Sequence, residues 1–378
     1  WWDSSPLVYP AWMKKMVDSA PDERKESLAQ ELLRLYDPEK PENTLFRGVT
    51  TNPPLSLAAM QHDPERWLAW IKEYVLAHPN SGVEDVFWAL YKEIVHLGAL
   101  AFAPAFEKSG YLYGYLSGQV DPRRFFEQEI MLSQALDLSL LAPNVMIKIP
   151  GTSQGLQVIR ELTRRGISTN CTAAYTVPQF VQVAEAVQAG LLEARANGVD
   201  LTRWRSVITY MSTRWENAAE FDADARAAGV ELTPELRRLA GVAIFKQAQQ
   251  IIRSRAYPSK MLICSVRLGP VVDGEMRCWH LEETAGADAV FTLQPNFLTE
   301  LFNQASDLDF EARIWKPIPA EALELLNKIP YFVRSFQPDG WSVEEFNTLP
   351  PLQSTFKEFS GATEKMVAFV AERMPQGS

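Results

Sequence analysis

Short apolar runs alternate with longer amphipathic segments along most of this chain of 378 residues. Each apolar run has the length of a strand, and the segments between them have the periodicity of helices. Because parallel strands need crossover connections, this alternation predicts a parallel sheet covered by helices. The predicted strands lie at residues 1–3, 46–52, 111–120, 144–149, 166–173, 205–211, 260–266 and 289–293.

Eight strand–helix units in succession predict an α/β protein with a (β/α)8 TIM barrel. We expect the barrel to occupy residues 1–306 as one catalytic domain. Residues 307–378 contain two or three helical segments and a proline-rich break, "NTLPPLQ", and we expect a C-terminal helical extension packed on the barrel. Asp121 and Pro122 fit the N-cap and the first position of the helix after the third strand.

Charge and composition limit the partners. The net charge of −10 argues against nucleic acid or an anionic membrane as the main partner, although a local site can still bind phosphate. The longest apolar stretch, "IVHLGALAFAPAF", is too short to span a bilayer, and no signal peptide is recognised. Monomer and homodimer both stay open.

The cysteines and histidines indicate the compartment and the cofactors. Cys171, Cys264 and Cys278 are widely spaced and odd in number, so we expect buried reduced thiols in a cytoplasmic protein. Four scattered histidines lack metal-ligand spacing, and therefore no metal and no cofactor is predicted.

Polar residues recur near the C-terminal ends of the predicted strands. In a barrel these ends converge on one mouth, where active sites lie, so the residues are informative as a set. Taken singly, each has an ordinary structural explanation such as turn formation or capping. The set comprises Asp3, Asn52, Gln119, Lys148, Thr172, Thr209, Ser265 and Arg267.

Lys148 is the least ordinary member because it stands inside the apolar run "NVMIKI". Its side chain shares a strand face with Met146. Burial would lower the pKa of the lysine, and a neutral amine can attack a ketone to form a Schiff base. The alternative is a lysine that reaches solvent or pairs with Asp3.

Five segments of the chain form a recognisable set: "GVTTNPPLSL" (48–57), "SGQVDPR" (117–123), "NVMIKIPGTSQGLQVIRELTRRGISTNCTAAYTVPQ" (144–179), "ICSVRLG" (263–269) and "GADAVFTLQPNFLTEL" (286–301). Together they resemble the transaldolase family, a metal-free class I Schiff-base group with a (β/α)8 barrel. The resemblance covers roughly residues 46 to 301 and is most specific around Lys148.

The resemblance implies catalytic roles for residues of the first five strands. Lys148 is then the Schiff-base lysine, and Asp3 takes and returns the proton of the C4 hydroxyl. Thr172 helps to position the catalytic water.

The resemblance also implies substrate contacts. Asn52 and Thr209 match positions that hold the dihydroxyacetone unit. Arg214 and Arg267, with Ser265, match phosphate-binding positions, and arginine forks suit phosphate oxygens. The alternative for both arginines is a surface ion pair.

Two positions depart from the family pattern. Transaldolases usually carry a glutamate where this chain has Gln119, whereas the related fructose 6-phosphate aldolases carry glutamine. Those aldolases also place a tyrosine on the sixth strand, where this chain has Met211. Tyr210 is one residue away and therefore points to the opposite face of the strand.

The resulting prediction is a transferase of carbohydrate metabolism, in the pentose phosphate pathway or a specialised pathway, that acts on sugar phosphates. It transfers a dihydroxyacetone unit from a ketose phosphate to an aldose through Lys148. Two alternatives remain: an aldolase that releases free dihydroxyacetone, and a catalytically silent barrel that binds a sugar phosphate.

Overall fold

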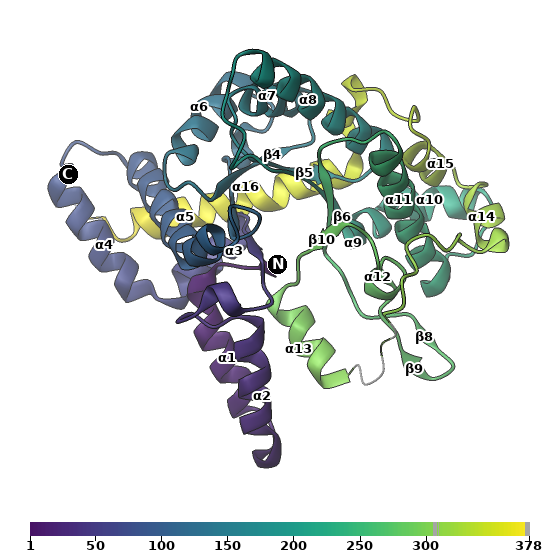
Figure 1. Cartoon of the computed structure of the whole chain (residues 1–378), viewed down its shortest axis with the longest axis horizontal. Coiled ribbons are helices and arrows are strands. Elements are labelled where there is room, and N and C mark those ends of the chain that lie inside the picture. The colour runs from purple at the N-terminus through teal and green to yellow at the C-terminus, as the bar shows by residue number, and fades with distance from the viewer. Residues whose placement is uncertain (305–307, 309, 375–378) are drawn as a thin grey trace. The chain divides into compact units, whose positions relative to one another are not determined.

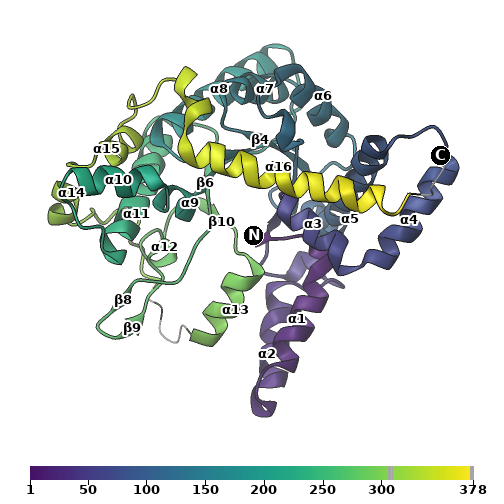
Figure 2. The same cartoon turned by 180° about the vertical axis from the view of Figure 1, so that it is seen from behind.

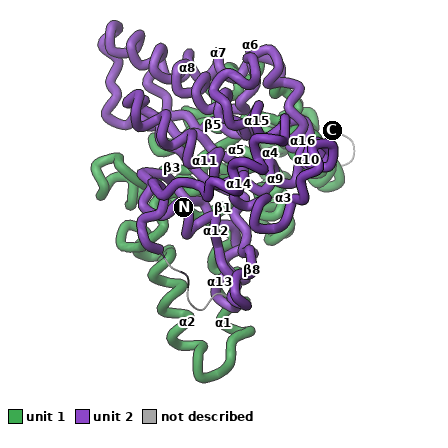
Figure 3. Tube along the Cα trace, turned by 90° about the vertical axis from the view of Figure 1, so that its right-hand side faces the viewer, with its two compact units in different colours: residues 1–125, 129–148, 356–378 green, residues 126–128, 149–355 purple. Residues whose placement is uncertain are grey.

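The computed structural model describes residues 1–304, 308 and 310–374. The chain divides into two compact units, each built from its own set of contacts (Figure 3). Unit 1 comprises residues 1–125, 129–148 and the chain from 356 onward, and unit 2 comprises residues 126–128 and 149–355.

Parallel strands form the framework of both units. All eight predicted strands are present, within a few residues at each end, and in each unit they follow one another in chain order. The alternation of eight parallel strands with helices confirms the predicted α/β barrel class. Unit 1 holds β1 (Trp2–Asp3), β2 (Gly48–Thr50), β3 (Tyr115–Gln119) and β4 (Val145–Pro150, up to Lys148), and unit 2 holds β5 (Thr169–Ala174), β6 (Ser206–Met211), β7 (Lys260–Cys264) and β10 (Ala289–Phe291).

The first half of the chain contains more separate helices than its pattern predicted. The segment between β2 and β3, expected to be helical, forms three α-helices, and the segment between β1 and β2 forms two, of which α1 was not predicted. Helices α1 and α2 lie side by side (Figure 1). These helices are α1 (Tyr9–Asp18), α2 (Asp22–Leu35), α3 (Pro53–His62), α4 (Pro64–Ala77), α5 (Val83–Lys108) and α6 (Gln128–Ser139), with 3-10 helices η1 (Pro6–Val8) and η2 (Pro41–Asn43).

The helix predicted to begin at Asp121 and Pro122 begins later. Asp121 does cap a helix, since its side chain accepts from the Arg123 N–H, but that element is the 3-10 helix η3 (Pro122–Arg124). The α-helix starts at Gln128. The carboxylate of Asp121 also pairs with Arg123 at 2.7 Å, which fixes this turn directly after β3.

In unit 2, helices α7 and α8 lie side by side, as the upper part of Figure 1 shows. A small antiparallel hairpin of β8 (Val271–Val272) and β9 (Glu275–Met276) follows β7 and was not predicted. The helices are α7 (Ser153–Arg164), α8 (Val177–Ala196), α9 (Ser212–Glu216), α10 (Ala219–Ala227), α11 (Pro234–Ser254), α12 (Trp279–Glu282) and α13 (Pro295–Gln304).

The region expected to be a helical extension contains helices, as predicted. Helices α10 and α15 contact each other, as do α11 and α14 (Figure 2). The expected boundary between residues 306 and 307 lies outside the described residues. The elements are α14 (Ala320–Leu326), α15 (Pro330–Phe336), η4 (Glu344–Thr348) and α16 (Pro350–Ala371).

Helix α5 covers one face of the strands in unit 1. A Cβ added to Gly98 would lie 2.6 Å from Leu116 of β3, and one added to Gly118 would lie 3.0 Å from Val95 of α5. Leu116 and Gly118 therefore face the helix. Because side chains alternate along a strand, Ser117 and Gln119 point to the opposite, inner face.

By length and composition alone helix α5 could cross a membrane, whereas the apolar stretch inside it, "IVHLGALAFAPAF", was expected to be too short to do so. Half of the most apolar stretch of α5 is buried inside the protein. A core helix of a globular protein shows the same pattern. The three cysteines are buried, as predicted, and each is a free thiol. Burial raises the pKa of Cys171, which favours its protonated form.

Candidate active site

The strand register of unit 1 places three predicted site residues, Asp3, Gln119 and Lys148, at two successive levels of the inner face. Asp3 pairs with Thr50, which in turn pairs with Ser117 of β3. Two residues further along β3, Gln119 pairs with Lys148 of β4. Paired residues of a parallel ladder share a face, so Gln119 and Lys148 project inward together.

Lys148 is buried, with 4% of its surface exposed. Its Nζ donates a hydrogen bond to the main-chain oxygen of Thr51, 2.9 Å away, and therefore does not extend to solvent. Thr51 is fixed in turn, because its hydroxyl donates to the Ser117 oxygen at 2.7 Å. The amine is thus held on the inner face by the residue that follows β2, two strands away in the sheet.

Asp3 is a buried carboxylate on the same face. Its Oδ1 accepts a hydrogen bond from the Thr50 hydroxyl at 2.7 Å. A buried carboxylate needs such donors, because an unpaired one would be strongly destabilising. The contact leaves Asp3 oriented by β2, as a base in a proton transfer has to be oriented.

Gln119 has a fixed main chain and an unsatisfied side chain. The Tyr91 hydroxyl donates to the main-chain oxygen of Gln119 at 2.7 Å and accepts from the main-chain N–H of the same residue at 2.9 Å. Burial raises the pKa of Tyr91, so its hydroxyl keeps the proton that it donates. Within the described part of the chain, both side-chain polar atoms of Gln119 are buried without a hydrogen-bond partner.

A small pocket lies beside Gln119 within unit 1. It is lined by residues of α5, of the turn after β3 and of α16, among them Tyr91, Asp121 and Thr363. Buried amides are nearly always hydrogen-bonded, and an unpaired one costs about 1–3 kcal/mol. A water molecule or a substrate hydroxyl at this side chain would remove that cost.

Asn52 has a structural function that its sequence context suggested. Its Oδ1 accepts from the Leu55 N–H at 3.0 Å and caps helix α3. The cap fixes the orientation of the side chain directly beyond the end of β2. A capping role does not exclude a ligand contact, since the amide group also carries two donors.

In unit 2, Thr209 lies next to a residue that the sequence analysis missed. The Thr209 hydroxyl donates to Oδ1 of Asn170, 2.7 Å away, and both side chains are buried. Asn170 is two residues before Thr172 on β5 and therefore shares its face. The two-residue spacing from Thr172 could have indicated Asn170 as a site residue. It was missed because Asn170 lies inside the strand rather than at its end.

The inner face of unit 2 is identified by Tyr210. Its ring packs against Phe180 of α8 and Phe245 of α11, with centroids 5.6 and 6.5 Å apart. Tyr210 thus faces the covering helices, as the one-residue offset predicted. Thr209 and Met211, its neighbours in β6, project to the other face.

Thr172 and Met211 meet on this inner face. The Thr172 hydroxyl lies 3.9 Å from the Met211 sulfur, and the hydroxyl of Tyr175 lies 3.4 Å from the same atom. Tyr175 was not predicted, because the pairing of β5 shifts between Cys171 and Ala174, and Ala173 has a φ of 50°. The alternation of side chains in a regular strand therefore does not predict on which face the side chain of Tyr175 lies.

The predicted phosphate-binding residues belong to two adjacent segments of unit 2. Arg214 is half-buried on α9, and Arg267 is exposed after β7, where its Nη1 donates to the Val266 oxygen at 2.8 Å. Ser265 has a φ of 58°, which costs a non-glycine residue about 1–3 kcal/mol. Such strain is concentrated at functional sites.

No group of three His, Cys, Asp or Glu side chains suited to a metal ion occurs within residues 1–304, 308 and 310–374.

A parallel sheet with buried polar side chains at the carboxyl ends of its strands defines the class of α/β-barrel proteins whose sites lie at those ends. The family model described as transaldolase/fructose-6-phosphate aldolase matches residues 30–333. The chain belongs to this family.

Individual relatives carry the same name. The chain is 33% identical to the transaldolase of Saccharopolyspora erythraea over 198 residues. This matched region covers 52% of this chain and 52% of the relative. It is 32% identical over 206 residues to the transaldolase of Kocuria rhizophila, covering 54% of this chain and 55% of the relative. The transaldolase of Thiobacillus denitrificans is 30% identical over 205 residues, 54% of this chain and 56% of the relative. The chain thus spans about half the length of the curated relatives it matches.

Proposed function

We propose that this protein is a transaldolase-type transferase. It moves a dihydroxyacetone unit from a ketose phosphate to an aldose acceptor through a Schiff base on Lys148. The observation that carries the proposal is the burial of Lys148 on the inner sheet face, at one level with Gln119. Family membership supports the same chemistry.

In the first half of the proposed reaction, neutral Nζ of Lys148 attacks the C2 ketone, and water leaves to give an iminium ion. Asp3 removes the proton of the C4 hydroxyl. The C3–C4 bond then breaks, its electron pair moves toward the iminium nitrogen, and an aldose departs. An enamine remains on Lys148, and attack on the acceptor aldehyde followed by hydrolysis releases the new ketose.

The other residues position these groups. We propose that Gln119 and Thr172 hold the water that leaves and returns, which would give the unsatisfied amide of Gln119 its partner. Asn52 and Thr209 orient the dihydroxyacetone unit, and such positioning supplies the entropic part of catalysis.

Phosphate binding completes the proposed substrate contacts. Arg214 and Arg267, with Ser265, bind the phosphate group, and guanidinium forks match its oxygens. We also propose that residues 1–306 form the catalytic barrel and residues 307–378 its helical extension. The reaction is proposed to need no metal, so that chelation by EDTA leaves turnover unchanged, and to take place in the cytoplasm.

Borohydride trapping tests the Schiff base directly. Reduction in the presence of fructose 6-phosphate is expected to add the mass of the bound sugar fragment to the peptide that contains Lys148. Tight sugar binding without any adduct would instead indicate a silent sugar-phosphate-binding barrel.

A second candidate function is aldolase-type cleavage that releases free dihydroxyacetone. It is favoured by Gln119, since the resemblance places glutamine at this position in fructose 6-phosphate aldolases. Product analysis with and without an acceptor aldehyde separates the two. Transfer requires the acceptor, whereas an aldolase releases dihydroxyacetone in its absence.

A further inference from the structure

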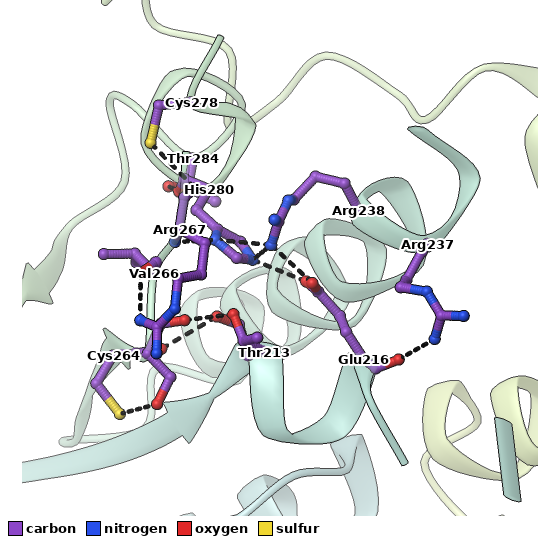
Figure 4. A network of polar contacts seen from close by, with 12 residues as sticks. Thr213, Glu216, Arg237, Arg238, Cys264, Val266, Arg267, Cys278, His280 and Thr284 are labelled. Carbon is purple, nitrogen blue, oxygen red and sulfur yellow. Dashed lines mark hydrogen bonds and ion pairs between the residues drawn. The ribbon is translucent and has the colours of Figure 1, made fainter. Parts of the chain in front are cut away.

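Unit 2 contains a buried charged cluster that the proposed reaction does not use. Figure 4 shows Glu216 of α9, Arg238 of α11 and His280 of α12 pointing toward one another. Glu216 and His280 are 2% and 0% exposed. Charged groups are rarely buried so completely without a specific partner, so the contacts of this cluster need an explanation.

His280 joins the cluster to the main chain at Arg267. Its Nδ1 accepts a hydrogen bond from the Arg267 N–H at 3.0 Å, and its Nε2 lies 2.7 Å from Oε1 of Glu216. Nη1 of Arg238 lies 3.0 Å from Nδ1 and 2.5 Å from Nε2. The contacts with Arg267 and Glu216 are satisfied together by the neutral Nε2–H tautomer, in which Nδ1 accepts. Burial lowers the pKa of His280, which favours this neutral form.

Glu216 holds the other end of the connection. It is the last residue of α9, two positions after Arg214, and its Oε2 accepts from Nη1 of Arg238 at 2.7 Å. The carboxylate fits closely against α11, since a Cβ added to Gly241 would lie 2.1 Å from Oε1 of Glu216. Its position is therefore fixed from two sides.

Helix α9 is also tied to the end of β7 at its first residues. The Ser212 hydroxyl donates to the Cys264 oxygen at 3.0 Å, and the Thr213 hydroxyl donates to the Ser265 oxygen. Both ends of this five-residue helix are thus connected to the segment of residues 264–267. Arg214 lies between these two connections.

We propose that Glu216 and His280 are positioning residues that fix the main chain at Arg267 relative to α9 and so align Arg214 and Arg267 for a phosphate group. This proposal rests on the proposed function, which makes those arginines the phosphate-binding residues. A buried carboxylate–imidazole pair adds little to stability compared with apolar residues of the same size, but it defines a geometry. Bidentate phosphate recognition depends on such geometry.

The test compares His280→Leu, which removes both hydrogen bonds, with His280→Asn, whose Oδ1 retains an acceptor near the place of Nδ1. For each folded variant we would measure the Kd of inorganic phosphate, the KM for fructose 6-phosphate, and the rate of borohydride-trapped adduct formation with dihydroxyacetone, which has no phosphate. For His280→Leu we expect phosphate Kd and KM to rise about tenfold. Adduct formation should stay within about twofold of wild type, and His280→Asn should recover most of the phosphate binding.

Two further variants keep the test decisive. Gly241→Ala should displace the Glu216 carboxylate and weaken phosphate binding, although alanine normally stabilises a helix relative to glycine. His96→Leu is the control, because Nδ1 of His96 in unit 1 also contacts the main chain, in this case the Leu141 oxygen at 2.9 Å. It should leave phosphate binding unchanged.

The outcomes separate this inference from the proposed function. Unchanged phosphate binding in folded His280→Leu and Gly241→Ala would overturn the inference, as would an equal loss of phosphate binding and dihydroxyacetone adduct. Absence of any adduct in the wild-type protein would overturn the Schiff-base function instead. The phosphate measurements do not depend on that result.

Discussion

The two units hold their candidate site residues by different means. In unit 1 the contacts come from β2 and the residue after it: Lys148 donates to Thr51, and Asp3 accepts from Thr50. In unit 2 the segment that carries Arg267 is held by His280, which is itself fixed by Glu216. The proposed reacting groups of unit 1 are therefore oriented by one strand of the sheet and its end, whereas the segment proposed to bind phosphate depends on buried side chains from helices.

Because the two sets of site residues are held by different contacts, amino-acid substitutions should affect them differently. The strands that carry Asp3 and Lys148 are themselves held in register by main-chain hydrogen bonds of the sheet. A buried side-chain network loses its function when a single member is removed, because its partners are left unsatisfied. Substitutions of Lys148 or Asp3 in unit 1 should consequently affect the proposed chemistry, and substitutions around Arg267 in unit 2 the proposed phosphate binding.

The largest effect is expected from Lys148→Arg. Turnover should fall by about 10⁴-fold or more, because arginine keeps the charge but cannot supply a neutral amine. Mass spectrometry after borohydride reduction should detect no adduct, while inorganic phosphate still binds. Lys260→Arg, at the exposed start of β7, is the control and should retain the adduct. Intact turnover in Lys148→Arg would remove the basis of the proposed function.

Asp3→Asn should reduce the rate of carbon–carbon cleavage by about 10²–10⁴-fold. The amide oxygen can still accept from Thr50, so folding and Schiff-base formation should persist while proton transfer is lost. Single-turnover measurements of aldose release, beside the rate of adduct formation, distinguish the two steps. Equal loss of both would show that Asp3 acts structurally.

Arg267→Met addresses unit 2 by itself. Loss of a charge-assisted contact to phosphate should raise the KM for fructose 6-phosphate by about 10–100-fold. The adduct with dihydroxyacetone should form at the wild-type rate, since that ketone has no phosphate. Arg253→Met, a second arginine of the same unit whose guanidinium lies over Trp315, is the control. An unchanged KM would favour the alternative of a surface ion pair for Arg267.

The smallest expected effect is a change of stability with pH. Burial lowers the pKa of His280 below its ordinary value of 6.5, so the unfolded chain binds a proton near pH 6.5 that the folded protein does not. The free energy of unfolding should therefore decrease as pH falls below 6.5, by at most about 1.4 kcal/mol per pH unit from this residue. Urea unfolding of wild type and His280→Asn at pH 7.5 and 5.5 isolates the contribution. An identical pH dependence in both proteins would contradict it.

Much of the fold was predictable because period and length act locally. The run around Lys148 identified β4, and the neighbouring runs identified the other parallel strands. Helix α1 was missed, and η3 was mistaken for the start of α6 although its cap at Asp121 was recognised. Whether such a cap continues into an α-helix depends on packing beyond the turn.

The candidate site was predictable wherever a polar residue interrupts an apolar strand. Gln119 and Lys148 stand out in this way, and their register follows from the parallel sheet. Tyr175 was missed because a left-handed residue, Ala173, changes the direction of the chain after β5. Such a local irregularity interrupts the two-residue alternation of side chains, so the sequence pattern does not predict where the next side chain points.

The sequence alone determined the alternation of strands and helices and which residues of a regular strand share a face, because both follow from the fixed geometry of neighbouring residues. Only the tertiary structure decided that Glu216 and His280, which are 64 positions apart, meet and hold the Arg267 main chain. A contact between distant residues depends on how helices pack, and packing is set by the sum of many side-chain shapes rather than by any local pattern.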